Sequence, residues 1–528
     1  MAKPNDGERE RQKLVGRAGV VGAGTLFSRV LGLGRDMALA AIFRREETDA
    51  FFVAFTIPNA LRQLLGEGAI ASAVVPVLSQ KLAADDGDES AKAFFSRVRG
   101  VSLLSLTVVT VLGILFARPI TNLFAGGYHG AELERTVQLT RIVFPYLFFM
   151  GTAALGMAAL NAKRKFAVAA FAPGLLNVAF IAAAFLLPGP FERMGIDRSV
   201  AIGVGALVGG MLQVIAQWPA LRKIGFASRP KIDLNDKAVR EVLRRIAPMT
   251  FGIGVYYVDL VLSRRFLSEL GTGAQSYFTW AMRLCDFPQG IFVMALSTAA
   301  LPSLSEFAAR GNMEDLGKTF AHGLKLALFV AIPASVALAF LAEPLIVTLF
   351  QRGQFDAVAS HETARALIWQ GSAIWTVAVV RQVVPVFYAL GDTRTPVIVS
   401  AFDLLAFIAL AVFLRGPLGH VGISVAVAGS SFVQMALLVV MLQRRLATTH
   451  AGEIFIAALR TLAASLVGVV VARGAIAALS TTTIPRVLPG LIAFALFCAA
   501  FAIAATVLRS PELGELSGAL KRRLGRSR

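Results

Sequence analysis

The chain has 528 residues, of which 56% are hydrophobic and only 16% are Asp, Glu, Lys or Arg, against roughly a quarter in ordinary soluble domains. A soluble chain of this length would need more polar surface, so the composition excludes a cytosolic enzyme, a disordered scaffold and a secreted disulfide module. Both cysteines, Cys285 and Cys498, lie in apolar runs and offer no disulfide framework or cysteine-based metal site. The composition predicts an all-α polytopic membrane protein.

Apolar runs that could cross the bilayer follow one another along the chain. Crossing ~30 Å of hydrocarbon takes about 20 residues as a helix, and about fourteen runs meet this requirement. They begin near Ala18, Asp49, Ser96, Thr136, Phe166, Ser199, Val239, Ala274, Thr319, Val358, Thr395, Val421, Ile454 and Arg486. The polar stretch before the first run, and the charges inside that run, argue against a cleavable signal peptide.

The basic residues, which give a net charge of +19, cluster in alternate connections between the apolar runs. One side receives residues 1–17, 163–165, 222–245, 444–445 and the C-terminal tail. The excess of Lys and Arg on the cytoplasmic side of membrane proteins therefore places both termini in the cytoplasm.

A weak internal repeat divides the chain. Val75–Gln80 resembles Leu301–Glu306, and Ala170–Phe171 resembles Ala401–Phe402 at a similar separation of about six spans. An even number of spans between the copies predicts two six-helix lobes in a parallel pseudo-repeat, plus two C-terminal helices. The expected parts are a cytoplasmic N-tail (1–17), an N-lobe (18–222), a basic cytoplasmic linker (223–238), a C-lobe (239–446), two further spans (447–508) and a basic cytoplasmic C-tail (509–528).

Several charged residues lie where a membrane helix should be apolar. An arginine at a helix centre costs roughly 2.5–3.5 kcal/mol on insertion scales, so such residues usually face a water-filled cavity. The arginines in this position are Arg29, Arg62, Arg283 and Arg381. Snorkelling or pairing with a nearby carboxylate is the alternative, and it applies most directly to Arg35 beside Asp36.

A cavity lined with guanidinium groups suits a polyanion, because arginine binds phosphate oxygens through a planar fork of donors and stays charged. No Gly-rich nucleotide-binding loop appears in the polar segments, so ATP hydrolysed by this chain is not the expected energy source. The residues alone predict a transporter of a phosphate-bearing, amphiphilic substrate.

At these residues the chain resembles the MurJ/MviN family, the lipid II flippases of bacterial cell-wall synthesis. The resemblance is carried by Phe27–Gly32, Gly34–Asp36, Asp49–Phe55, Pro58–Arg62, Gly66–Ala69, Leu349–Phe355 and Tyr388–Pro396. It implies the fold of the multidrug/oligosaccharidyl-lipid/polysaccharide exporter superfamily. It also implies a non-enzymatic function, which is moving undecaprenyl-diphosphate-linked disaccharide pentapeptide from the inner to the outer leaflet of the bacterial inner membrane by alternating access.

The resemblance also implies which residues bind the substrate. Family residues essential for flipping match Arg29, Arg35 and Arg62, with Asp49 as the matching acid, and Arg283 carries over from a later motif. Asp36 and Arg381 complete the expected substrate site, and the last two spans (447–508) are expected to form an apolar groove for the prenyl tail. Before Arg283 the family commonly has an acid where this chain has Met282, and Asp286 stands in for a Glu.

Other functions and partners remain open at this stage. An exporter of drugs or of another lipid-linked oligosaccharide would share the fold, although cavity arginines disfavour a drug. A scaffold for a cell-wall synthesis complex would not need intramembrane arginines. Membrane lipids and that complex are further expected partners, and nucleic acid is not.

A cation site is expected in the second lobe. Asp259 and Asp403 lie inside apolar runs, and two carboxylates brought together would repel each other unless a proton or cation lay between them. Oxygen ligands suit Na⁺, with Ser400 or Ser424 adding hydroxyls, and the resembled family has a sodium site in this lobe. Pairing with an arginine such as Arg381, or protonation, is the alternative. No other cofactor is expected.

Overall fold

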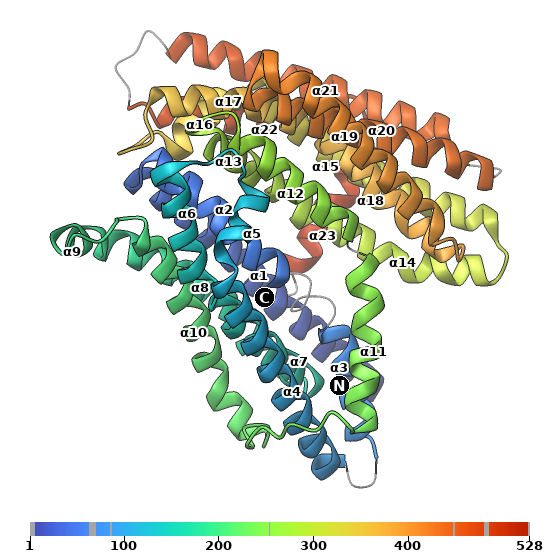
Figure 1. The fold of residues 1–528 in the computed structure, drawn as a ribbon. Coiled ribbons are helices and arrows are strands. Elements are labelled where there is room, and N and C mark those ends of the chain that lie inside the picture. The colour runs from blue at the N-terminus through green and yellow to red at the C-terminus, as the bar shows by residue number, and fades with distance from the viewer. Residues whose placement is uncertain are drawn as a thin grey trace. The chain divides into compact units, whose positions relative to one another are not determined.

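The computed structural model describes residues 6–62, 70–84, 87–252, 254–446, 449–479 and 485–525, and every regular element in these ranges is a helix (Figure 1). The Gly66–Ala69 stretch and the outermost residues of both tails lie outside the described residues. Contacts divide the chain into two compact units, Met1–Thr272 and Gly273–Arg528.

The first unit contains the helices that run from blue to green in Figure 1. They are α1 (Asp6–Ile42), α2 (Arg45–Arg62), α3 (Ile70–Leu82), α4 (Gly87–Leu115), α5 (Ala117–Phe124), α6 (Gly130–Val143), α7 (Tyr146–Ala162), α8 (Phe166–Leu186), α9 (Pro188–Arg193), α10 (Val200–Lys223), α11 (Lys237–Gly252) and α12 (Gly254–Ser268). In this unit α8 packs between α1 and α10, while α7 packs against α3, α4 and α10.

The basic connection between α10 and α11 packs along α4 and is held there by hydrogen bonds and an ion pair. Ser96 Oγ donates a hydrogen bond of 2.6 Å to the Arg229 carbonyl, and the Lys231 N–H donates one of 3.0 Å to the Ser96 carbonyl. Gly100 permits this approach, because a Cβ there would lie 2.2 Å from the Lys231 carbonyl oxygen. An ion pair of 2.7 Å between Arg97 and Asp236 completes the attachment. The predicted linker is therefore an ordered part of the first unit.

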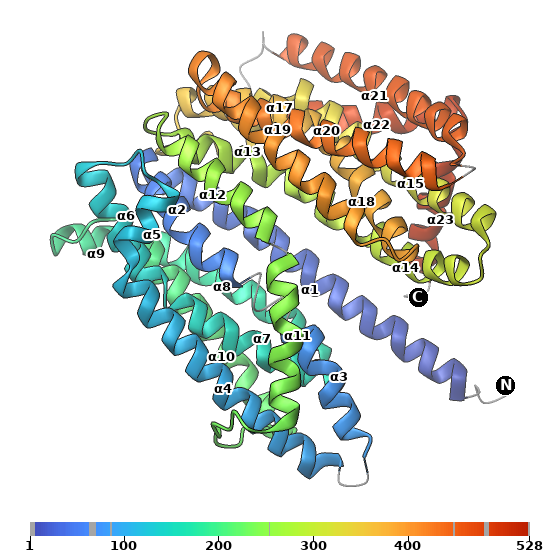
Figure 2. The same ribbon diagram turned by 45° about the vertical axis from the view of Figure 1, so that its right-hand side comes forward.

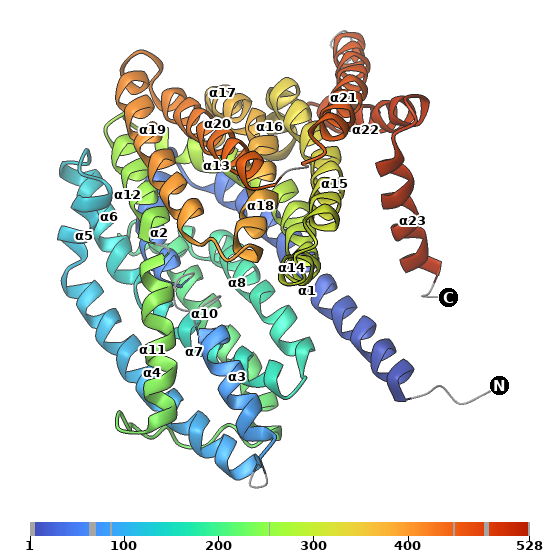
Figure 3. The same ribbon diagram turned by 90° about the vertical axis from the view of Figure 1, so that its right-hand side faces the viewer.

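The second unit contains the remaining elements. They are α13 (Ala274–Pro288), the π-helical turn η2 (Gln289–Val293), α14 (Met294–Ala309), α15 (Met313–Phe340), α16 (Ala342–Phe350), α17 (Ala357–Ser372), α18 (Ile374–Ala389), α19 (Arg394–Leu418), α20 (His420–Arg445), α21 (Ala451–Leu479), α22 (Leu488–Val507) and α23 (Pro511–Gly525). The hairpins α19–α20 and α21–α22 each pack along their length (Figure 2). Figure 3 shows α23 leaving the end of α22, and its Leu513 and Leu516 pack on Phe329 of α15 and Ala505 of α22.

Ten helical stretches within the described residues are long and apolar enough to cross a bilayer, so the chain is a multi-pass membrane protein. They match the predicted spans that begin near Ser96, Thr136, Phe166, Ser199, Thr319, Val358, Thr395, Val421, Ile454 and Arg486. The predicted spans near Ala18, Asp49, Val239 and Ala274 are also helical, as α1, α2, α11–α12 and α13–α14. Most of the predicted site residues lie on these four less apolar stretches.

The grouping by contacts assigns α11 and α12 to the first unit. The repeat in the sequence instead begins the second lobe at residue 239. The two descriptions differ only in these two helices, and the lobe boundary derived from the repeat stays a prediction.

Candidate functional site

Arg35 on α1 is held by side chains on its own helix and on α8. Its Nε and Nη2 lie 2.8 and 2.7 Å from Asp36 Oδ1, and Nη1 donates to Asn177 Oδ1 at 3.1 Å. Asn177 in turn donates from Nδ2 to the Ser28 carbonyl of α1 at 2.9 Å. The Arg35–Asp36 pair is therefore a fixed unit that bridges α1 and α8, with Arg29 half-buried on α1. Asn177 was not among the site residues predicted from the sequence, although a polar amide inside an apolar run indicates a specific hydrogen-bonding role.

Aromatic side chains pack against the guanidinium group of Arg35. The Arg35 Cζ lies 5.4 Å from the centroid of the Phe180 ring. Phe180 meets Phe51 and Phe55 of α2 edge-on, with centroids 5.7 and 5.8 Å apart. A cation over an aromatic face is stabilised by the negative face of the ring, and more strongly where water is excluded. The arrangement orients Arg35 without using all of its five N–H donors.

Arg62 occupies the last turn of α2. Its Nε donates to Asn59 Oδ1 at 3.0 Å on the same helix. Most residues of α2 before Arg62 are buried in the packed interior of the first unit, whereas Arg62 itself is half-buried.

Asp49 lies at the other end of α2 and is fully buried, with 0% of its surface exposed. The buried Tyr128, on the loop between α5 and α6, is close enough to Asp49 and to the buried Arg264 of α12 to feel both charges. Burial, followed by the Asp49 and Glu132 carboxylates, raises the pKa of Tyr128, while Arg264 acts in the opposite direction. In this structure Asp49 therefore belongs to a buried charge cluster. Tyr128 and Arg264 were not predicted as members of the site.

The end of α12 packs on that same loop and on α5. The Gly127 N–H donates to Ser268 Oγ at 3.0 Å, and Arg265 Nη1 donates to the Asn122 carbonyl at 3.1 Å. A Cβ at Gly127 would lie 2.5 Å from the Ser268 carbonyl oxygen, so only glycine fits without displacement. This contact ties α12 to the same loop that carries Tyr128.

In the second unit, Arg283 lies on α13 shortly before the helix changes its winding. Ala281 and Cys285 face the packed interior, whereas Arg283 is half-buried and Asp286 is exposed. The π-helical turn Gln289–Val293 follows, and the Met294 N–H donates to the Gln289 carbonyl across five residues. Such turns insert one extra residue into an α-helix and occur frequently at functional sites. Arg381 is half-buried on α18, which packs against this turn and α14.

The predicted cation ligands lie on three helices. Asp259 is half-buried on α12 of the first unit, and Asp403 is half-buried on α19 of the second. Asp403 Oδ1 is buried and accepts no hydrogen bond from the described residues. Ser400 Oγ donates to the Pro396 carbonyl at 2.9 Å, and Ser424 Oγ of α20 accepts from Gln370 at 2.9 Å. The described residues contain no group of three or more His, Cys, Asp or Glu side chains that could hold a metal ion.

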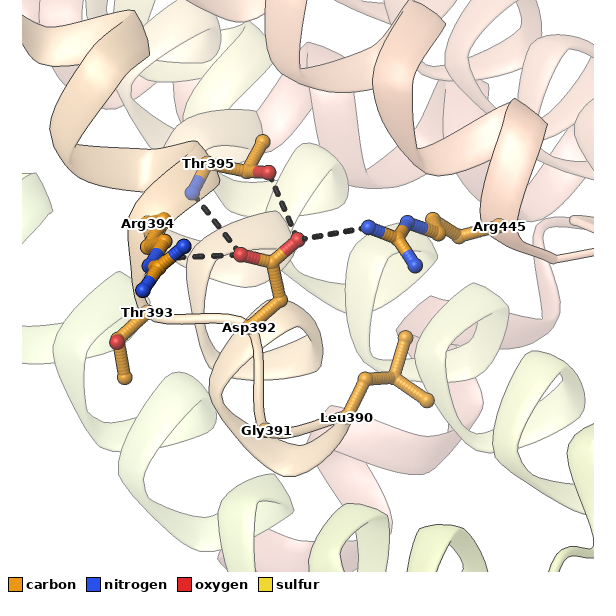
Figure 4. Close-up of a pocket in the computed structure, with 7 residues that line it drawn as sticks. All are labelled: Leu390, Gly391, Asp392, Thr393, Arg394, Thr395 and Arg445. Atoms are coloured by element: carbon orange, nitrogen blue, oxygen red, sulfur yellow. Dashed lines mark hydrogen bonds and ion pairs between the residues drawn. The ribbon is translucent and has the colours of Figure 1, made fainter.

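The motif from Tyr388 to Pro396 forms a capped corner beside a pocket of about 420 Å³ (Figure 4). Asp392 Oδ1 accepts from the N–H groups of Arg394 and Thr395, at 3.1 and 3.0 Å. Its Oδ2 accepts from Thr395 Oγ1 at 2.7 Å and from Arg445 at the end of α20 at 3.3 Å. Because Asp392 already satisfies the amides at the start of α19, the corner is a structural cap that joins α19 and α20.

These features define a polytopic membrane protein that carries several half-buried charged residues on its helices. The sequence matches the family described as lipid II flippase MurJ over residues 39–495. The lipid II flippase MurJ of Burkholderia cenocepacia is 36% identical over 431 residues, which cover 80% of this chain and 82% of that protein. The chain belongs to the lipid II flippase MurJ family.

Two solved structures show the same fold. A lipid II flippase MurJ in an inward closed conformation matches with a TM-score of 0.75 and 24% identity, over 92% of this chain and 98% of that one. An inward-facing multidrug resistance MATE transporter of the MOP superfamily matches with a TM-score of 0.64 and 16% identity, over 80% and 96%. The fold that the resemblance implies is thereby confirmed.

Proposed function

We propose that this chain flips lipid II, the undecaprenyl-diphosphate-linked peptidoglycan precursor, from the cytoplasmic to the periplasmic leaflet of the bacterial inner membrane. The observation that carries the proposal is its membership of the lipid II flippase family over most of its length. The half-buried arginines on α1, α2, α13 and α18 support it. Placing an arginine within a bilayer costs free energy, and such residues usually bind a substrate or line its path, here an anionic one.

Arginines are the proposed ligands of the diphosphate. Arg29, Arg62 and Arg283 supply guanidinium groups, with Arg35, Asp36, Asp49 and Arg381 shaping the site. Charge-assisted bidentate hydrogen bonds to phosphate oxygens are among the strongest available to a protein. The rigid Arg35–Asp36–Asn177 network supports this role, since a group already oriented loses less entropy when the substrate binds.

Transport follows an alternating-access cycle in which both termini stay in the cytoplasm. The apolar helices α21 and α22 accommodate the long prenyl tail, and their exposed Val470 and Ile503 side chains suit a hydrocarbon chain. Association with a cell-wall synthesis complex is part of the same proposal.

A sodium ion is the proposed coupling cation. The buried Asp403 Oδ1, which accepts no hydrogen bond from the described residues, has the character of a ligand for a hard cation. Asp259, Ser400 and Ser424 are the other residues that would hold the ion. When bound, Na⁺ would supply positive charge that neutralises the carboxylates. Loss of sodium dependence in the Asp403→Asn variant would support the site, and full retention would contradict it.

The test of the main proposal is depletion of the protein in a bacterium followed by measurement of which leaflet holds lipid II. Depletion should leave the precursor on the cytoplasmic side, and plasmid-borne protein should restore its appearance outside. Unchanged distribution of lipid II after complete depletion, with no other flippase expressed, would contradict the proposal. Accumulation of a different lipid-linked oligosaccharide would instead identify another substrate for the same fold.

A further inference from the structure

Two departures from regular α-helical hydrogen bonding face each other in the second unit. One departure is the π-turn Gln289–Val293 between α13 and α14. The other is in α18, where Pro385 lies inside the helix. Proline lacks an N–H group, so the carbonyl four residues earlier loses its donor within the helix. In α18 that carbonyl belongs to Arg381.

Each departure receives a side-chain hydrogen bond from the opposite helix. Ser297 Oγ on α14 donates to the Arg381 carbonyl at 2.7 Å. Gln382 Nε2 on α18 donates to the carbonyl of Val293, the last residue of the π-turn, at 3.3 Å. Ser297 and Gln382 are 8% and 4% exposed, and Val293 is fully buried. The contact is therefore a reciprocal clasp, made of two buried side chains that each bond to the other helix's backbone.

The clasp lies between two arginines of the proposed substrate site. Arg381 supplies one of its carbonyl groups, and Arg283 precedes the π-turn on α13 by less than two helical turns. One inserted residue rotates the preceding helix by about 100° relative to a continuous α-helix, so the π-turn decides which way Arg283 faces. Broken helices with freed backbone groups are also typical of transporter substrate sites.

We propose that Ser297 and Gln382 are positioning residues for lipid II binding. They set the register between α13–α14 and α18 and thereby the relative placement of Arg283 and Arg381. This inference rests on the proposed function, in which those two arginines bind the diphosphate.

The first experiment compares Ser297→Ala with Ser335→Ala in the full-length protein in lipid nanodiscs. Ser335 Oγ accepts a hydrogen bond of 3.1 Å from the Trp375 N–H at the start of α18, and the residue is 3% exposed. Both variants therefore remove a buried hydroxyl that contacts α18, but only Ser297 lies beside Arg381. Titration with lipid II measures affinity, and the thermal midpoint measures stability.

The Ser297→Ala variant should bind lipid II about fivefold more weakly, which corresponds to ~1 kcal/mol, the usual net value of one hydrogen bond. Ser297→Thr, which keeps the hydroxyl, should bind like the wild type, and Gln382→Leu should weaken binding as Ser297→Ala does. Ser335→Ala should lower the thermal midpoint and leave affinity unchanged. Equal affinity loss in Ser297→Ala and Ser335→Ala, or none in Ser297→Ala, would overturn the inference.

A second experiment tests the role of the proline. Pro385→Ala restores an N–H that can bond the Arg381 carbonyl within α18. Adding Ser297→Ala to the Pro385→Ala protein should then cause no further loss of lipid II affinity. A full fivefold further loss would show that the hydroxyl acts in another way. Failure of the wild-type protein to bind lipid II would count against the proposed function itself, whereas normal wild-type binding with unaffected clasp variants would count against the clasp alone.

Discussion

The charged groups of the two units are held in place by different means. In the first unit α1 runs without interruption from Asp6 to Ile42, and Arg35 is oriented by the side chains of Asp36, Asn177 and Phe180. In the second unit α13 gives way to a π-turn, and Arg381 lies four residues before a proline. There the bonds from Ser297 and Gln382 go to backbone carbonyl groups.

This difference separates two ways of placing a guanidinium group in a membrane protein. A regular helix sets the direction of its side chains, so neighbouring side chains must make the final adjustment. An irregular helix changes the direction of everything that precedes or follows the irregularity, so groups that bind its backbone control the placement. Side-chain changes should therefore affect the first unit most, and changes in backbone geometry the second.

Loss of the arginines themselves should have the largest effect and should not distinguish the two units. Arg29→Ala, Arg62→Ala and Arg283→Ala should each abolish complementation while membrane levels stay normal. A hydrogen bond to a charged group contributes about 1.5–3 kcal/mol, and each arginine can donate several. Lysine should rescue poorly because it lacks the planar fork. Normal growth with all three replaced by Ala would refute the proposed site.

Removal of Asn177 tests the side-chain network of the first unit. Asn177→Leu deletes both the acceptor for Arg35 and the donor to the Ser28 carbonyl, and with them the side-chain link between α8 and α1. We expect a loss of about 1–3 kcal/mol in the free energy of unfolding, together with slower flipping. Val178→Leu on the same helix is the control, because Val178 is 45% exposed. If Asn177→Leu behaved like this control, the network would not orient Arg35.

Gly127 tests whether the first unit also contains a place where backbone geometry decides. In Gly127→Ala the new Cβ would meet the Ser268 backbone carbonyl at 2.5 Å, whereas in Gly126→Ala it would meet the flexible end of Arg265 at 2.1 Å. The first should cost about 1–3 kcal/mol, as overpacking usually does, and the second clearly less. Thermal unfolding of both variants measures the difference. Equal losses of stability would show that the backbone at Ser268 can shift to accommodate a Cβ at Gly127.

The smallest effect is expected at the Asp392 corner, which caps the start of α19. Hydrogen bonds from the Thr395 N–H and hydroxyl, followed by the Arg394 N–H and the Arg445 charge, lower the pKa of Asp392. A lowered pKa means that the ionised form stabilises the fold above about pH 4, and this contribution is lost as the pH falls through the lowered value. Asp392→Ala should cost about 1 kcal/mol, as loss of a helix cap usually does.

The pH dependence provides the check on this assignment. The stability difference between wild type and Asp392→Ala, measured by thermal unfolding, should shrink as the pH is lowered from neutral toward pH 3. A difference that stays constant over this range would show that the carboxylate charge does not contribute.

The amino-acid sequence by itself determined the membrane class, the helical fold and the helices that carry the charges. Continuous apolar runs must form helices in lipid, because every backbone polar group needs an internal partner there. The ten apolar spans were therefore predictable, and so were the less apolar stretches with Arg29, Arg62 and Arg283. The family resemblance was carried by the same local stretches and is confirmed.

Only the tertiary structure decided which side chains act on those charges. The helix α1 continues without a break from Asp6 to Ile42, whereas the irregular π-helical turn lies at Gln289–Val293. Asn177 binds Arg35, and Tyr128 lies close to Asp49 and Arg264, across elements that are distant in sequence. The hydrogen bonds of Ser297 and Gln382 likewise join α14 to α18. Periodicity reports which face of a helix is apolar, but hydrogen bonds between helices depend on rotation and register, which packing sets.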